Sequence, residues 1–264
     1  MIKKDIVVGL GEIGRPILNI ISKTNLAVGY DINPKLVDKK FHKYENSKTR
    51  FIHICIPYTD TFLNNVIELY EKFHPSAIVI HSTIKVNTTK ILQSKLPIPV
   101  IYSATRGVHK RMFYDLKRYT KFFALDPSAP KMKWASSEYS KLMKSSGVKV
   151  KQISTPITLE LAKILCDTSY LGWLINYAQI TNMIAQEYDV NYDEMWSFAD
   201  EIHEYLGNRP KMFPGYIGGH CVIPNLELIH NQTLNLIKEM NDLYGKKVKN
   251  AKKIALKYGA KLDR

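Results

Sequence analysis

The stretch "KDIVVGLGEIGRPILNIIS", residues 4–22, decides the fold of this chain. It begins with a short apolar run and continues through Gly9, Gly11 and Gly14, which have the spacing GxGxxG. Apolar residues then recur at the spacing of one helix face, at Ile13, Ile17, Leu18 and Ile21. The order of strand, glycine turn and helix predicts the first unit of a nucleotide-binding sheet.

A second apolar run, "NLAVGYD" at residues 25–31, ends in Asp31. In a dinucleotide-binding fingerprint an acidic residue about twenty residues after the glycines binds the ribose hydroxyls. The first glycine makes the tight turn, the second lets the backbone approach a pyrophosphate, and the third lets the helix pack closely. We therefore predict an NAD site that discriminates against the 2′-phosphate of NADP, with Lys35 as the one nearby cation that opposes this preference.

Three more apolar runs follow, at residues 50–57, 77–83 and 99–105, with an amphipathic helix at about residues 60–73. Short apolar strands that alternate with helices predict an α/β fold with a doubly wound parallel sheet. His53 and His81 lie inside these runs and are predicted to be core histidines. Doubly wound folds bind ligands at strand ends, so residues there are predicted cofactor contacts, namely Pro57, Thr59, Ser82 and Thr83.

From about residue 154 the sequence changes character. Residues 154–190 have helical periodicity, and Thr155 followed by Pro156 is a good helix start. We predict a Rossmann domain over residues 1–153 and an all-α substrate and dimerisation domain, built on this long helix, over residues 154–264. Lys163 and Asp167 are four residues apart and would share one helix face, as a functional pair or as an ordinary surface ion pair.

An apolar stripe on the long helix is too broad for a solvent-facing surface. It predicts a homodimer, whereas the alternative is packing against the chain's own domains. Its members are Tyr170, Trp173, Leu174, Tyr177, Ile180 and Ile184.

Composition narrows the possible partners. The chain has 264 residues and a formal charge of +14, which favours an anionic small-molecule partner. No nucleic-acid-binding signature accompanies the dispersed lysines, so we expect no nucleic-acid partner. No apolar run is long enough for a signal peptide or a membrane span, and we expect a cytoplasmic protein without membrane association. Three cysteines without a CxxC pairing indicate neither a disulfide framework nor a metal site.

Glycines surround one of these cysteines, in "FPGYIGGHCVIPN" at residues 213–225. Backbone freedom around Cys221 indicates a presented thiol, although a glycine-rich turn with a small apolar residue would look the same. Cys55 lies in an apolar strand and Cys166 on an apolar helix, so both are predicted to be buried packing residues.

Taken in order, these motifs resemble the UDP-glucose/GDP-mannose dehydrogenase family over nearly the whole chain, without that family's C-terminal nucleotide-binding domain. The collinear matches are "VVGLGEIG", "GYDINP", "HICIPYT", "HSTIKVNTT", "TLELAKILCDT" and "FPGYIGGHCVIPN". The resemblance implies that the Cys221 thiolate captures an aldehyde as a thiohemiacetal, and that a second hydride transfer and hydrolysis then give an acid. It also implies that the Lys163 ammonium stabilises the developing oxyanion.

The chain departs from the family at several positions. Asp167 stands where the family has Asn, and Asn225 where it has Asp, so one carboxylate and one amide exchange places. Ala104 and Thr105 stand at the family's Pro-Glu positions, and the glycine loop before Cys221 is one residue shorter. A hydroxyl is not a carboxylate base, so we expect hydride transfer with slow or absent thioester hydrolysis.

The predicted function is NAD-dependent oxidation of an alcohol in an anionic sugar, a nucleotide sugar or a hydroxy acid. Two alternatives stay open: a non-redox enzyme that binds S-adenosylmethionine, and a binding or dimerisation module that has lost catalysis. The predicted catalytic residues are Cys221, Lys163, Asp167 and Asn225; the cofactor-binding residues are Gly9, Gly11, Glu12, Ile13, Gly14, Asp31, Pro57, Thr59, Ser82 and Thr83; the substrate-binding residues are Thr105, Arg106, Gly218, Gly219 and His220.

Overall fold

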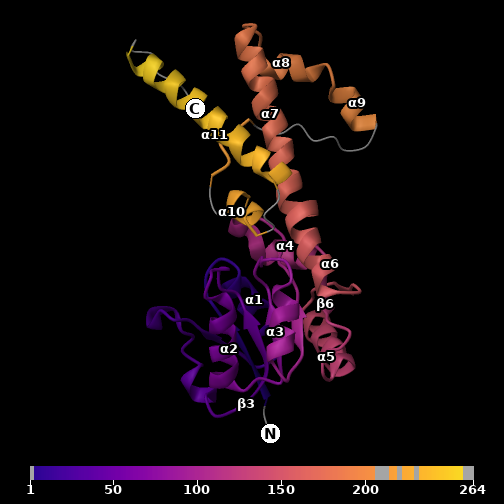
Figure 1. The fold of residues 1–264 in the computed structure, drawn as a ribbon. Coiled ribbons are helices and arrows are strands. Elements are labelled where there is room, and N and C mark those ends of the chain that lie inside the picture. Colours follow the sequence, from indigo (N-terminus) through magenta and orange to yellow (C-terminus); the bar gives the residue numbers. More distant parts are fainter. Residues whose placement is uncertain (1–2, 206–213, 219–221, 229–231, 258–264) are drawn as a thin grey trace. The chain divides into compact units, whose positions relative to one another are not determined.

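The chain is organised as two compact units, described here from a computed structural model (Figure 1). The described residues are 3–205, 214–218, 222–228 and 232–257. The first unit is Met1–Lys163 and the second is Ile164–Arg264. The two units divide after Lys163, within the helical stretch that begins at Pro156, whereas we expected the boundary between residues 153 and 154.

The first unit is built on a seven-stranded sheet with the order β2-β1-β3-β4-β5-β6-β7. The strands are β1 Lys3–Val8, β2 Ala27–Tyr30, β3 Lys48–Ile54, β4 Ala77–Ile80, β5 Val100–Tyr102, β6 Lys121–Leu125 and β7 Val150–Gln152. Every neighbouring pair is parallel except β5 and β6. The predicted α/β fold is therefore confirmed, and β6 and β7 extend the sheet beyond the predicted strands.

Helices cover both faces of this sheet. One face packs on α1 Gly14–Ile21, α4 Met112–Arg118 and α5 Met132–Ser145. The other face packs on α2 Phe62–Phe73, α3 Thr88–Lys95 and Leu159 of α6 Pro156–Ala162. Three short 3₁₀ helices, Pro34–Leu36, His42–Tyr44 and His109–Arg111, lie in the connections. Because both faces are buried, the central strands are apolar almost without interruption, which explains why they were predictable.

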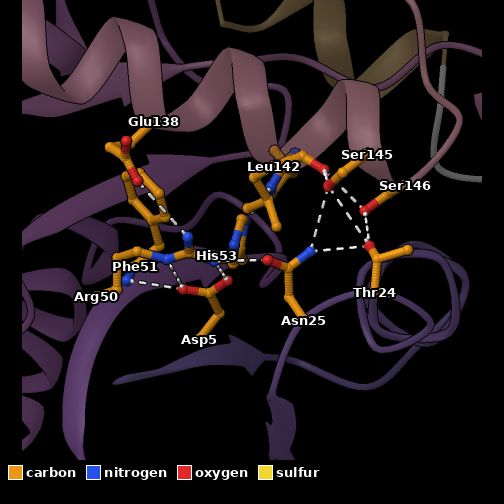
Figure 2. A network of polar contacts seen from close by, with 11 residues as sticks. Asp5, Thr24, Asn25, Arg50, Phe51, His53, Glu138, Leu142, Ser145 and Ser146 are labelled. Atoms are coloured by element: carbon orange, nitrogen blue, oxygen red, sulfur yellow. Dashed lines mark hydrogen bonds and ion pairs between the residues drawn. The ribbon is translucent and has the colours of Figure 1, made fainter. Parts of the chain in front are cut away.

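A polar network ties the amino ends of β1 and β3 to α5 (Figure 2). The guanidinium of Arg50 donates two hydrogen bonds to the buried Asp5, at 3.0 and 2.6 Å, and lies 3.8 Å from a carboxylate oxygen of Glu138. Asp5 also accepts the backbone N–H of Phe51 at 3.2 Å. A buried carboxylate needs such partners, so this network holds the end of the sheet opposite the glycine loop.

The helical stretch from Pro156 is not a single α-helix. The hydroxyl of Thr155 accepts the N–H of Thr158, which caps α6 as the sequence indicates. A π-helical segment, Lys163–Ser169, separates α6 from α7 Tyr170–Glu187. A π-helix changes the angular spacing of side chains, so α-helical periodicity does not apply within it. The prediction that Cys166 is a buried packing residue is accordingly wrong, because Cys166 is exposed.

The second unit is helical. Besides α7 it contains α8 Tyr192–Ser197, α9 Asp200–Tyr205, α10 Ile223–Leu226 and α11 Gln232–Lys257. Helices α7 and α11 pack closely at Gly172, where an added Cβ would lie 3.0 Å from a side-chain carbon of Ile237. Among the described residues, no helix combines the length and apolar character that a membrane span requires.

Candidate functional site

The glycine loop lies where the sheet changes its direction of winding, between β1 and β3. Gly9 has a φ of +86°, and a Cβ there would lie 2.8 Å from the carbonyl oxygen of Cys55. A Cβ on Gly14 would lie 1.8 Å from the carbonyl oxygen of Gly9. The fold itself requires these two glycines, one for the turn and one for the close approach of α1.

Gly11 differs from its two neighbours in the motif. A Cβ on Gly11 would meet no atom of the described residues within 4 Å, and its backbone does not have a positive φ. Nothing in the first unit's own packing therefore explains a glycine at this position. The open space beside the Gly11 backbone fits a ligand that approaches the main chain closely, as a pyrophosphate does in dinucleotide sites.

Asp31 is fixed beside this loop. One carboxylate oxygen accepts the N–H of Leu10 at 2.7 Å, and the other accepts the N–H of Asn33 at 2.9 Å. Each oxygen keeps a second lone pair, so the carboxylate is still able to accept hydrogen bonds from ribose hydroxyls. The residues of β1, the glycine loop and the end of β2 thus fit NAD.

Glu12 brings a second loop to the glycine turn. A carboxylate oxygen of Glu12 lies 2.5 Å from Nδ1 of His109, which follows β5. Glu12 is exposed, whereas Ile13 is partly buried and packs on the core beneath α1. The loop after β5 therefore contacts the edge of the glycine turn.

The loops after β3 and β4 meet at the same edge of the sheet. The hydroxyl of Ser82 donates to the carbonyl of Ile56 at 2.5 Å and joins these loops. Thr59 is exposed and lies 3.1 Å, oxygen to oxygen, from Thr61. Pro57 is also exposed and Thr83 is half-buried. All four predicted strand-end contacts follow β3 or β4 at the carboxyl edge, where the glycine loop also lies.

Sequence reasoning missed a buried lysine at this edge. Lys121, the first residue of β6, donates hydrogen bonds from Nζ to Ser103 O at 2.9 Å, Ala104 O at 3.4 Å and Thr105 Oγ1 at 3.0 Å. The hydroxyl of Tyr139 donates to Ser103 Oγ at 2.8 Å, behind this contact. The only signal in the sequence is a lysine at the head of the apolar run "KFFAL", which also suits a surface strand end.

Burial perturbs the titratable groups of this cluster. Desolvation, with smaller contributions from the positive charges of Lys163 and Arg106, lowers the pKa of Lys121 to about 7, and Cys55 opposes this shift. Desolvation raises the pKa of the Cys55 thiol to about 12. Cys55 packs against the core, so a reactive thiolate is not expected there.

Two histidines form a buried pair on adjacent strands. Nδ1 of His53 lies 2.9 Å from Nε2 of His81, and both residues are almost fully buried, as the sequence indicates for core histidines. Their remaining ring nitrogens have no hydrogen-bond partner among the described residues. Burial, with the charges of Arg50 and Lys121, lowers the pKa of His53 to about 3, and burial lowers the pKa of His81 well below its usual value.

The histidine pair predicts acid lability. An unfolded histidine titrates near pH 6.5, so below that pH the unfolded state binds protons that the folded state excludes. The free energy of unfolding should fall as the pH falls from 6.5 towards 3, and His53 alone should cost about 3 kcal/mol at pH 4.5. Urea unfolding at pH 7 and pH 4.5, followed by Trp134 fluorescence, measures this difference.

Two double variants test the assignment. The pair His53→Leu with His81→Leu removes both buried rings and should flatten the pH dependence between 4.5 and 7. The exposed residues His42 and His74 provide the matched control, and His42→Asn with His74→Asn should leave the dependence unchanged. An unchanged dependence in the leucine variant would assign the acid sensitivity to other groups.

Gly219, His220 and Cys221 lie outside the described residues. The segment just before them is held by amide side chains of α7 and α11. Asn241 accepts the N–H of Ile217 at 2.7 Å and donates to its carbonyl at 3.1 Å. Gln179 donates to Gly215 O at 2.8 Å and to Asn241 Oδ1 at 3.2 Å. Three of these bonds hold the backbone of Gly215 and Ile217, and the fourth orients the two amide side chains toward each other.

Two further predicted residues of the second unit, Gly218 and Asn225, flank residues 219–221 in the sequence. Gly218 is exposed, and Asn225 is a half-buried residue of the short helix α10. Asp167 is half-buried in the π-helical segment, whereas Lys163 is the last residue of the first unit. Lys163 and Asp167 lie in one π-helical segment, in which residues four apart still point to nearly the same side, so their proposed pairing stays a prediction.

The chain resembles several solved dehydrogenases in structure, although no protein-family model and no curated protein matches its sequence. The UDP-D-ManNAc dehydrogenase of Pyrococcus horikoshii superposes with a TM-score of 0.79 at 19% identity, over 98% of this chain and 73% of that one. The UDP-N-acetyl-mannosamine dehydrogenase Cap5O of Staphylococcus aureus gives 0.70 at 18% identity, over 99% and 72%. The 3-hydroxyisobutyrate dehydrogenase of Mycobacterium tuberculosis gives 0.59 at 14% identity, over 99% and 89%. At these identities the likeness establishes the fold.

Proposed function

We propose that this chain is an NAD-dependent oxidoreductase that oxidises an alcohol of an anionic sugar, a nucleotide sugar or a hydroxy acid. The observation that carries the proposal is the glycine loop at the β1–β3 switch point. Two of its glycines are required by the fold, whereas the third, Gly11, leaves an open approach to the backbone. Ligands of doubly wound sheets bind at such switch points.

The residues at this edge would hold the cofactor in a defined order. The backbone of the glycine loop and the start of α1 would face the pyrophosphate, and Asp31 would accept the ribose hydroxyls. Ser82, Thr83 and Thr59 would contact the remaining part of the cofactor. When bound, NAD would supply the hydride acceptor for the oxidation.

We assign the catalytic residues by the sequence resemblance. Lys163 would stabilise the oxyanion that develops as the alcohol is oxidised, and Cys221 would capture the aldehyde product covalently. Asp167 and Asn225 would provide the carboxylate and amide at exchanged positions. By the same resemblance, Gly218, Gly219 and His220 would bind the substrate.

An anionic substrate suits the charge of the first unit near Thr105. Arg106 follows Thr105 and is exposed. The positive charge of Lys163 also acts in this region, since it lowers the pKa of Lys121. The structural relatives support the same class of substrate, because their names specify UDP-sugars in two cases and a hydroxy acid in the third.

Cofactor titration tests the proposal directly. We expect calorimetry to show tighter binding of NAD than of NADP, because the Asp31 carboxylate would repel a 2′-phosphate. Asp31→Asn keeps an oxygen that accepts the N–H of Leu10 but removes the negative charge. The ratio of NAD affinity to NADP affinity should therefore fall by about tenfold or more. Tighter binding of NADP by the wild type would remove Asp31 from this role. Binding of S-adenosylmethionine in place of NAD would favour the non-redox alternative.

We also propose a homodimer built on α7. Tyr170, Trp173, Tyr177 and Ile184 of the predicted stripe are exposed, whereas the buried face of α7 carries the small or polar residues Gly172, Asn176 and Gln179. Large aromatic side chains on a solvent-facing helix are typical of an interface.

Light scattering measures this association. We expect about twice the chain mass of 30.4 kDa at micromolar concentration. Trp173→Glu with Tyr177→Glu should give a monomer, because two carboxylates would be desolvated at the interface. Tyr114→Glu changes an exposed tyrosine of the first unit and should stay dimeric. A monomeric wild type would overturn the dimer.

A further inference from the structure

Lys121 and Thr105 form an unusual contact for the interior of a Rossmann unit. Nζ of Lys121 lies 3.0 Å from Thr105 Oγ1, and the two residues are only 5% and 7% exposed. Within the described part of the chain, all hydrogen-bond acceptors of this ammonium are uncharged oxygens, those of Ser103, Ala104 and Thr105. A buried lysine without a carboxylate costs stability, and its neutral form is within reach near neutral pH.

Burial is the main reason that the Lys121 amine lies close to its neutral form, and the groups around it do not reverse this effect. Arg106 and Lys163 add positive charge from the loop after β5 and from the end of the first unit. His53 and His81, from β3 and the end of β4, are buried and held neutral by low pKa values. Cys55 favours the protonated amine, but burial raises its own pKa to about 12. Tyr139 reaches the cluster through Ser103 and stays neutral.

Thr105 connects this amine with the carboxyl edge of the sheet. Its backbone N–H donates to His81 O at 3.2 Å, which fixes the segment at the end of β4. It directly precedes Arg106, which is exposed and donates to Thr120 O at 2.7 Å. Thr105 therefore stands at the edge at which ligands of this fold bind, and its hydroxyl contacts the buried amine.

We propose that Thr105 and Lys121 form a proton-accepting pair for the substrate's hydroxyl group. This inference rests on the proposed function, and it adds a base that neither the motifs nor the resemblance identify. As the alcohol is oxidised, its O–H bond breaks and the proton passes to Thr105 Oγ1. The original Thr105 proton moves to the lone pair of Lys121 Nζ, which becomes an ammonium with three acceptors in place. The hydride leaves separately with the electron pair of the C–H bond.

The titration of Lys121 is measurable without any substrate. Proteins labelled with ¹³C at lysine Cε give one signal for each lysine, and Lys121→Arg identifies the signal of Lys121. We expect this signal to titrate with a midpoint near 7. A midpoint above 9 would mean that the amine stays charged at neutral pH, and it would overturn the pair.

Kinetics of NADH formation separate proton transfer from a structural role. The wild-type kcat should rise about tenfold per pH unit below 7 and then level off. Lys121→Arg keeps the charge and the donors but does not accept a proton, so kcat at pH 8 should fall by about 100-fold and lose this rise. Thr105→Val removes the hydroxyl and should have the same effect on kcat. Thr105→Ser keeps a hydroxyl, so its kcat should lie within several-fold of the wild-type value.

Lys4→Arg is the matched control. Lys4 is 2% exposed and donates from Nζ to the carbonyls of Tyr44 and Glu45, both at 2.6 Å, at the amino end of β1. It is expected to keep wild-type kinetics. If Asp167→Asn loses the rise of kcat with pH while Lys121→Arg keeps it, the base is Asp167 and the proposed Thr105–Lys121 pair is overturned. A wild type that binds no NAD would overturn the proposed function itself, which calorimetry with NAD alone reveals.

Discussion

Gly14→Ala should destabilise the first unit by at least about 3 kcal/mol, because its methyl group would lie 1.8 Å from the carbonyl oxygen of Gly9. A backbone oxygen does not move aside as a flexible side chain does, so α1 must shift away from β1. Urea unfolding followed by Trp134 fluorescence measures the loss, since Trp134 stacks on Phe51 in the same unit. If Gly14→Ala unfolds at the same midpoint urea concentration as the wild type, α1 does not approach the glycine turn this closely.

Gly11→Ala is the matched control, with the opposite expectation. Its methyl group meets no atom of the described chain within 4 Å, so stability should stay within about 1 kcal/mol of the wild type. The same methyl group would occupy the space that a pyrophosphate needs, and NAD affinity should fall by at least about tenfold. Unchanged NAD affinity in Gly11→Ala would place the cofactor elsewhere and remove the main support for the proposed function.

The glycine spacing and the buried strands made the first unit predictable. Strands β1 to β4 are mostly buried on both faces and each contains a short apolar run, so they stand out from the sequence without any knowledge of their partners. β7 was not predictable, because Val150–Gln152 is short and two of its three residues are polar. Its place in the sheet depends on pairing with β6, a contact between distant segments that local sequence does not encode.

The helical stretch from Pro156 was predictable at its start but not in its interior. Its start at Pro156 follows from local chemistry, the Thr155 cap and the fixed φ of proline. The π-helical segment at Lys163–Ser169 inserts an irregular turn that α-helical periodicity does not reveal. The sequence therefore indicated the right segment but not the burial of each of its residues, since Cys166 is exposed.

The buried cluster around Lys121 could not be predicted from the sequence, because its contacts join separate segments of the chain. A lysine at a strand end is usually solvated, and only the fold brings Ser103 and Thr105 of a different strand end to its ammonium. Likewise, the His53–His81 contact requires the register of β3 against β4. Residue types and spacing identified the glycine loop, whereas the polar interior behind it depends on tertiary packing.

Lys163→Ala should abolish most of the first hydride transfer, with a fall in kcat of about 100-fold to 1000-fold. Loss of one oxyanion-stabilising group at an active site has an effect of this size. Single-turnover formation of NADH measures the step, and Lys151→Ala, at an exposed lysine of β7, is the matched control that should keep wild-type rates. NADH formation at the wild-type rate in Lys163→Ala would remove Lys163 from the catalytic residues.

Cys221→Ser should leave this first step intact and stop oxidation at the aldehyde, because a serine hydroxyl is a far weaker nucleophile than a thiolate. The wild type should itself hydrolyse its thioester slowly, because Thr105 stands where the UDP-glucose/GDP-mannose dehydrogenase family has a glutamate, and the Thr105–Lys121 pair is proposed only for the alcohol proton. Product analysis then separates aldehyde, enzyme-bound thioester and acid. Iodoacetamide labelling adds a direct measure of the thiol, and it requires Cys166→Ser as the background because Cys166 is exposed. In that background Cys221 should label first and NAD should slow the reaction, whereas unchanged turnover in Cys221→Ser would leave a two-electron dehydrogenase without covalent capture.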